Sequence, residues 1–128
     1  MIDPLRIEQH GQVPVGRLSG EVDISAVPVV RDRLLRVLDN HGEGLVIDLT
    51  DTTYIDSAVV NMLFEVAERL GLHQLRLVVV VPEDGLVDRV LTIVDLSSVA
   101  DVYRRFDDAI QAFGTEPSSP ASPPPARP

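Results

Sequence analysis

Cysteine and lysine are both absent from this chain of 128 residues, and each absence excludes a set of chemistries. Without cysteine there is no disulfide, no thiolate nucleophile and no thiolate metal site. Without lysine there is no Schiff-base chemistry, no phosphate-loop lysine and no lysine-dependent phosphoryl transfer. Tryptophan is also absent and aromatic residues make up only 4 % of the chain. The core must therefore be built from Val, Leu, Ile and Ala, which favour central strands of a parallel sheet.

Basic residues and long apolar runs are scarce as well. The net charge of −9 argues against nucleic acid and against anionic membrane surfaces as partners, because both are bound by clustered cations. The longest apolar run, 77–81, is far shorter than the roughly 20 residues that span a bilayer. Residues 1–6 lack the basic start and apolar stretch of a signal peptide. We therefore expect a cytoplasmic protein.

Apolar residues recur alternately at strand and at helix spacing, which is typical of an α/β domain. We expect a mixed, mostly parallel sheet of about five strands with about four helices, the first two strands forming an antiparallel hairpin. The domain is predicted to cover residues 1–113. Residues 114–128 are rich in proline and serine and are predicted to be a disordered tail. Strands are expected at 5–8, 13–18, 45–49, 75–81 and 102–103, and helices at 27–41, 57–70, 84–95 and 107–113.

The most informative segment is 44–70, where an apolar strand and a polar stretch precede Asp56-Ser57 and a helical pattern. This order places a serine hydroxyl at the entrance of a helix, beside a carboxylate. Helix entrances leave backbone N–H groups unpaired and carry partial positive charge, so they tolerate an added phosphate. Ser57 is either an N-cap that stabilises its helix by about 1 kcal/mol or a site of modification. The pattern alone favours the cap.

Other acidic and histidine residues indicate no catalytic or metal site. Asp48, Asp51 and Asp56 together could hold Mg²⁺. Structural roles are favoured, with Asp48 accepting local hydrogen bonds, Asp51 in a turn and Asp56 preceding the cap. The histidines lack metal-ligand spacing, no nucleophile elbow surrounds the serine, and no phosphate-binding glycine loop occurs. We expect no metal, no cofactor and no hydrolase triad. The histidines are His10, His41 and His73.

Five short motifs resemble a STAS domain of the bacterial anti-sigma factor antagonist family. None is highly specific alone, but their order and spacing over 13–113 agree with the family. The resemblance implies the STAS-like fold. The motifs are Gly20-Glu21-Val22-Asp23, Leu45-Val46-Ile47-Asp48-Leu49, Tyr54-Ile55-Asp56-Ser57, Val87-Asp88-Arg89-Val90-Leu91 and Asp107-Asp108-Ala109-Ile110.

The resemblance also implies a protein that binds partners and is not an enzyme. Unphosphorylated members of this family bind an anti-sigma factor, usually a serine kinase with a histidine-kinase-like ATPase fold, and so release a sigma factor. The kinase phosphorylates the serine after the Asp, here Ser57, and a PP2C-type phosphatase restores it. We expect a monomer or weak dimer. The expected partner-binding residues are Gly20, Glu21, Asp23, Asp56, Ser57, Ala58, Val59 and Asn61.

The chain departs from the family pattern at two places. Ala58-Val59 stand where Ser-Gly usually follows the target serine, and Asp95 stands where a glycine is usual before Leu96. Valine removes the close backbone approach that glycine permits. This departure keeps a second hypothesis open, in which the domain binds a partner constitutively as a scaffold in a signalling or transport assembly.

Overall fold

The computed structural model describes residues 3–37 and 43–114. The expected α/β fold is confirmed, and a short 3₁₀ helix, η1, is added that the sequence did not predict. His41 and residues 115–128 of the expected tail lie outside the described residues, whereas Gly114 ends the last helix. The elements are β1 (Leu5–His10), β2 (Val13–Val22), α1 (Val27–Val37), β3 (Gly44–Ile55), α2 (Ser57–Leu72), β4 (Arg76–Val80), α3 (Leu86–Ile93), η1 (Leu96–Ser98), β5 (Asp101–Tyr103) and α4 (Phe106–Gly114).

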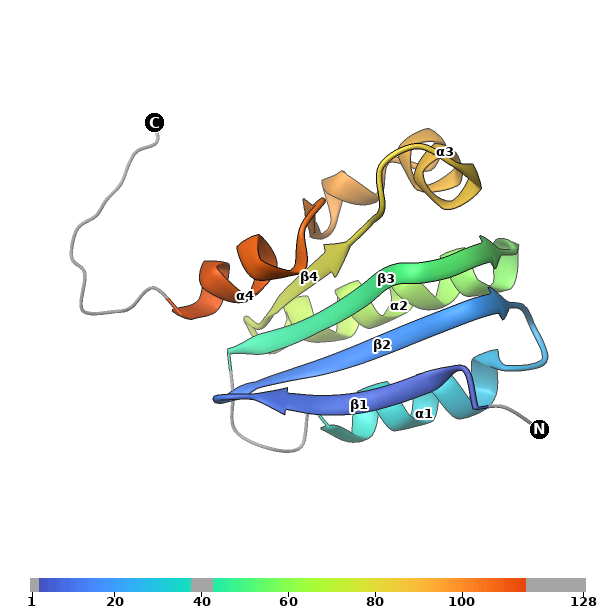
Figure 1. Ribbon diagram of the computed structural model, residues 1–128. Helices are drawn as coiled ribbons and strands as arrows, with labels where there is room; N and C mark the ends of the chain where they lie inside the picture. The colour runs from blue at the N-terminus through green and yellow to red at the C-terminus, as the bar shows by residue number, and fades with distance from the viewer. Residues whose placement is uncertain (1–2, 38–42, 115–128) are drawn as a thin grey trace.

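The five strands form one sheet in the order β1-β2-β3-β4-β5 (Figure 1). The β1–β2 hairpin is antiparallel and turns at Gly11, whose φ of 63° suits glycine. The other three pairings are parallel. The carboxyl ends of β2 and β3 therefore meet at one edge of the sheet, where α1 and α2 begin.

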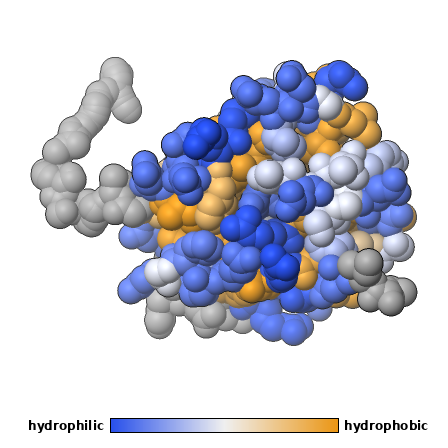
Figure 2. Space-filling model, in the orientation of Figure 1, coloured by the Kyte–Doolittle hydropathy of each residue, from blue (hydrophilic) through white to orange (hydrophobic). Residues whose placement is uncertain are grey.

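Alternation along β3 divides the core between the two faces of the sheet. Leu45, Ile47 and Leu49 face the larger cluster, which includes the apolar stripes of α1 and α2. Val46 lies in a smaller cluster with residues of α4. Figure 1 shows α1 and α2 behind the sheet and α4 in front of it. Figure 2 shows hydrophilic side chains across the middle of the front face, which α4 covers only in part.

Strands β2 and β3 run further than predicted. β2 continues to Val22 and β3 to Ile55, and these two residues are paired and buried. The segments 19–21 and 50–53 looked like loops because their residues are mostly polar. Register shifts between Arg17 and Ser19 and between Gly20 and Glu21 break the alternation there, as β-bulges do. The longer strands bring both segments to the same edge of the sheet.

Several helix ends also differ from prediction by one or two residues. Gly71 lies inside α2, and the backbone reverses at Gln74, with φ of 61°. α3 begins two residues later than predicted because Gly85, with φ of 98°, caps it, and it ends at Ile93. Asp95, at the family's glycine position, has φ of 59°. Across the part of the chain that the structure describes, no helix has the length and apolar character of a membrane span.

Candidate functional site

Asp56 caps α2, and Ser57 is the first residue of that helix. The Asp56 backbone is extended, and its Oδ1 accepts a hydrogen bond from the Val59 N–H at 3.1 Å. The expectation that Ser57 itself serves as the cap is therefore wrong, as is the placing of Asp56 one residue before it. An aspartate satisfies the orphan helix N–H as well as a serine does. Ser57 is exposed, and because Asp56 caps the helix, the Ser57 hydroxyl is not needed for capping.

The second carboxylate oxygen of Asp56 contacts the loop that joins β2 to α1. Asp56 Oδ2 accepts from the Ile24 N–H at 2.9 Å. This loop, residues 23–26 and hereafter the β2–α1 loop, is folded by Asp23, whose Oδ1 accepts from the N–H and hydroxyl of Ser25 at 3.0 and 2.6 Å. These two bonds, the hydroxyl first, hold the pKa of Asp23 below its ordinary value. Asp56 thus connects α2, the helix that begins with Ser57, to the β2–α1 loop, which carries the Asp23 carboxylate.

The structure brings most of the predicted partner-binding residues together at this edge. Register places Gly20 opposite Thr52 and Glu21 opposite Tyr54, just before Asp56. Asp56 and Ala58 are half-buried. Val59 is completely buried in the core, so this predicted partner-binding residue offers no surface to a partner. The exposed members of the set are Gly20, Glu21, Asp23, Ser57 and Asn61.

Three exposed apolar residues near the site were missed by the sequence reasoning. Ile24 is 67 % exposed, Val29 60 % and Tyr54 40 %. Val29 also lines a hollow of about 610 Å³ together with Gly20, Glu21 and Asp23. One signal was available for Ile24, because it stands between polar residues in a predicted loop where no core position was expected.

The edge of the sheet around Ser57 is strongly acidic. Segments 18–30, 49–64 and 81–88 follow or contain the ends of β2, β3 and β4, and none contains a basic residue. Arg104 reaches the edge from outside these segments and pairs with Asp88 at 2.8 Å, which lowers the pKa of that carboxyl. A partner of this edge should therefore present cations. The acidic residues are Glu21, Asp23, Asp51, Asp56, Glu83, Asp84 and Asp88.

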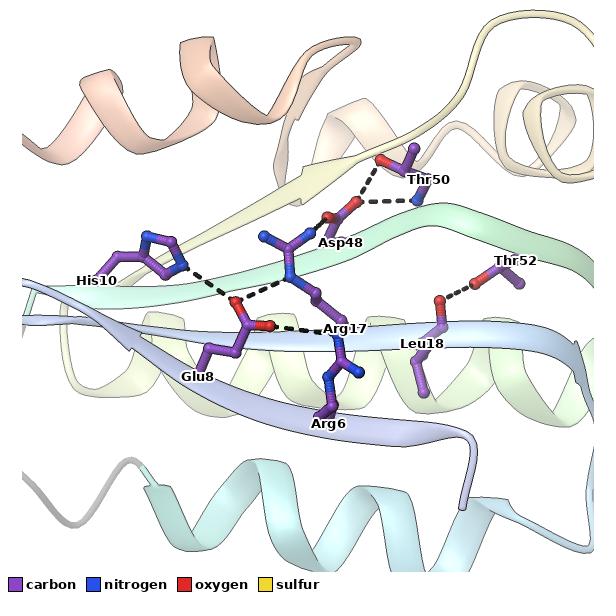
Figure 3. A network of polar contacts seen from close by, with 8 residues as sticks. All are labelled: Arg6, Glu8, His10, Arg17, Leu18, Asp48, Thr50 and Thr52. Atoms are coloured by element: carbon purple, nitrogen blue, oxygen red, sulfur yellow. Dashed lines mark hydrogen bonds and ion pairs between the residues drawn. The ribbon is translucent and has the colours of Figure 1, made fainter. Parts of the chain in front are cut away.

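The other acidic and histidine candidates lie elsewhere. Asp48 accepts from the N–H and hydroxyl of Thr50, as predicted, and also pairs with Arg17 (Figure 3). Asp51 lies within β3, so the prediction that it makes a turn is wrong. His10 contacts Glu8 at 3.1 Å and His73 ends α2. Within residues 3–37 and 43–114, no group of three or more His, Asp or Glu side chains could hold a metal ion.

Comparison with known proteins places this geometry in a family. The profile of the STAS domain matches residues 4–109. No curated protein matches the chain. An anti-sigma factor antagonist from Mycobacterium paratuberculosis is 26 % identical, with a TM-score of 0.73 over 86 % of this chain and 92 % of that one.

Two further solved structures share the fold. Unphosphorylated SpoIIAA, an anti-sigma factor antagonist, is 16 % identical with a TM-score of 0.70, covering 88 % of this chain and 99 % of its own. A single-residue variant of RsbS from Moorella thermoacetica is 18 % identical with a TM-score of 0.71, covering 86 % of this chain and 94 % of its own. The motifs, the sheet order and the profile match agree, and the chain belongs to the STAS domain family.

Proposed function

We propose that this STAS domain is an anti-sigma factor antagonist and that phosphorylation of Ser57 switches its binding. The observation that carries the proposal is the capping of α2 by Asp56, which leaves Ser57 exposed. In the part of the chain that the structure describes, no hydrogen bond engages the Ser57 hydroxyl. A kinase can therefore reach this oxygen without unfolding the helix.

The surface around Ser57 suits a protein partner with basic residues. We call the exposed residues Glu21, Asp23, Ile24, Tyr54 and Ser57 the docking surface. Its acidic rim and exposed apolar side chains fit a partner with an apolar pocket edged by Arg or Lys. The partner we propose is an anti-sigma factor of the serine-kinase type. A PP2C-type phosphatase would restore the free serine, and the domain itself, a cytoplasmic monomer or weak dimer, would catalyse nothing.

A phosphate on Ser57 would oppose docking by charge. It adds about 1.5 to 2 negative charges next to Asp56. The start of α2 can accommodate these charges because its backbone N–H groups favour anions. At a docked interface, however, like charges brought together out of water cost several kcal/mol. Since about 1.4 kcal/mol is a tenfold change in affinity, the modification would release the partner.

The Ala58-Val59 pair does not obstruct Ser57 in this fold. Val59 points into the core, where it is completely buried, and Ala58 is half-buried. The valine therefore replaces the family's glycine on the inner side of α2, away from the face that a kinase would meet. The departure from the family pattern changes packing below the serine more than access to it.

The proposal is tested with the ATPase-fold serine kinases of the source organism, each purified and incubated with ATP and the full chain. Wild type should gain one phosphate by intact mass, and Ser57→Ala should gain none. Ser57→Ala should bind the same kinase as tightly as wild type, whereas Ser57→Glu should bind at least about tenfold more weakly. Equal affinity of all three proteins for a kinase that binds wild type would reject Ser57 as the switch.

A second candidate function is a constitutive scaffold in a signalling or transport assembly. The observation that favours it is the absence of the family's Ser-Gly after Ser57. A scaffold would bind its partner with unchanged affinity after treatment with kinase and ATP. No gain of phosphate, together with retained binding, would select this candidate.

A further inference from the structure

The carboxylate of Asp56 serves two segments at once, one oxygen for each. Oδ1 accepts from Val59 N–H in its own helix at 3.1 Å, and Oδ2 accepts from Ile24 N–H in the β2–α1 loop at 2.9 Å. Ser57, which lies next in the chain, is the residue whose charge the proposed function would change. A change in the position of this carboxylate therefore also changes the hydrogen bonding of a loop 32 residues away in sequence.

Packing does little to fix the position of Ile24. Its side chain is 67 % exposed, so it gains little from burial. The backbone on either side is folded locally, by Ser25 donating to Asp23 and by Val27 N–H donating to the Ile24 carbonyl at 3.2 Å. These bonds shape the loop, but they do not attach it to the helix of Ser57. Ala26 of the loop packs against the core cluster that includes residues of α2, whereas Ile24 itself is held to that helix by the bond from its N–H to Asp56.

A phosphate on Ser57 would compete for both functions of Asp56. Phosphate oxygens at a helix start accept from backbone N–H groups, and the Val59 N–H that Asp56 now engages is one of the donors of this first turn. The same dianion repels the adjacent carboxylate. Asp56 would then lose its fixed orientation, and the Ile24 N–H its acceptor.

We propose that Ile24 is the apolar anchor of the docking surface and that Asp56 is the positioning residue that holds it for the partner and releases it when Ser57 is phosphorylated. The proposal rests on the proposed function. In addition to repelling the partner directly, the phosphate would change the position of the β2–α1 loop that carries Ile24. The partner's contribution would be an apolar pocket for the isoleucine, with Arg or Lys at its rim facing Glu21 and Asp23. The three acidic segments of this edge, which contain no basic residue, support that choice.

The first test uses the chain alone, so it needs no partner. Water exchange of the Ile24 amide is measured by NMR in wild type, Ser57→Glu and Asp56→Asn. Asparagine is as good an N-cap as aspartate, but one of its two polar atoms is a donor and cannot accept from Ile24. We expect Ile24 exchange to rise about fivefold in both variants, as the loss of one hydrogen bond implies. Val60 N–H, which donates to the Asp56 carbonyl at 3.1 Å, is the internal control and should be unchanged.

A double variant shows whether Ser57→Glu acts on the Ile24 amide through Asp56 or by disturbing the helix start independently. In an Asp56→Asn background, Ser57→Glu should leave Ile24 exchange where Asp56→Asn alone put it, because the link is already broken. Additive increases would overturn the coupling, as would an unchanged Ile24 amide in Ser57→Glu. Neither result contradicts the proposed function, which is tested separately by the affinity of the Ser57 variants for a kinase.

The second test examines the anchor with a kinase that binds wild type. Ile24→Ser should weaken binding at least about tenfold, as loss of a central apolar contact does. Ile93→Ser, at an isoleucine that is 80 % exposed on α3, is the matched control and should keep wild-type affinity. Equal losses in both variants, or none in either, would reject Ile24 as the anchor even if Ser57 proved to be the switch.

Discussion

Arg17 of β2 donates to the carboxylate of Asp48 on β3, on the sheet face that α4 partly covers (Figure 3). Asp48 is 2 % exposed, and Arg17 also binds Glu8 at 2.9 Å and stacks over the Phe106 ring at 4.3 Å from its centroid. The guanidinium therefore joins three strands to the start of α4. Phe106 is also in edge contact with His10, at 5.1 Å between ring centroids.

This arrangement predicts a large cost for removing Arg17 alone. Arg17→Met should lower the free energy of unfolding by about 3 kcal/mol, because a buried carboxylate loses its charge partner. Arg17→Met combined with Asp48→Leu should lose less than the single variant, since the unpaired charge is gone. Urea denaturation measures both. A double variant less stable than Arg17→Met would mean that Asp48 contributes through its bonds to Thr50 and not through the ion pair.

Glycine positions give a prediction in which backbone conformation alone sets the sign. Gly71 lies within α2 and Gly85 caps α3, and a Cβ would meet no atom within 4 Å at either residue. Gly71→Ala should raise the free energy of unfolding by about 0.5 kcal/mol, through helix propensity. Gly85→Ala should lower it by about 2 kcal/mol, because φ of 98° and ψ of −178° are strained for alanine. Thermal or urea unfolding of both variants checks the pair, and a shift of the same sign in both would contradict it.

The helix ends show what the sequence could and could not predict. Gly71 reads as a helix stop because glycine commonly ends helices, yet the chain continues and reverses at Gln74. Helix periodicity and the order of elements were predictable, because apolar spacing follows burial. The turn after α2 depends on where the chain must join β4, which begins at Arg76. This is a tertiary constraint that local residue preferences do not predict.

The site divides in the same way. The position of Asp56 and Ser57 at a helix start was predictable, because an apolar strand and a polar stretch precede them and apolar residues at helical spacing follow them. Which of the two is the cap was not, because both side chains can accept from a helix N–H and the backbone conformation decides. The bond from Ile24 to Asp56 links residues far apart in the chain. It follows from the extension of β2 and β3 through bulges that their polar residues concealed.

An acid-stability prediction follows from the pair between α1 and α2. Arg31 donates to Glu65 Oε2 through Nε at 2.8 Å and Nη2 at 2.6 Å, and these bonds hold the pKa of Glu65 below its ordinary value. A carboxyl with a lowered folded pKa contributes its full stability above its unfolded pKa, about 4.3. That contribution is lost as pH falls through the folded value.

Glu65→Gln should therefore reduce the loss of stability between pH 5 and pH 3 relative to wild type. Arg31→Met removes the cause of the shift and should flatten the same interval by a similar amount. The double variant should add nothing to either single change. Urea unfolding at a series of pH values measures all four proteins, and an unaltered slope in Glu65→Gln would refute the assignment.

Charge at Ser57 should affect the docking of a partner far more than the stability of the fold. A negative charge in the first turn of α2 is favoured by the helix dipole by about 0.3 to 1 kcal/mol. Repulsion from Asp56 and the weakened hydrogen bond between Asp56 and Ile24, about 1 kcal/mol, offset that gain. Ser57→Glu should consequently unfold at a urea concentration close to that of wild type, and Ser57→Lys at a lower one. The gap should shrink in high salt, since exposed charges are screened. If Ser57→Glu proved the less stable of the two, weak partner binding by that variant would reflect a damaged helix start, and repulsion at a docked interface would no longer be needed to explain it.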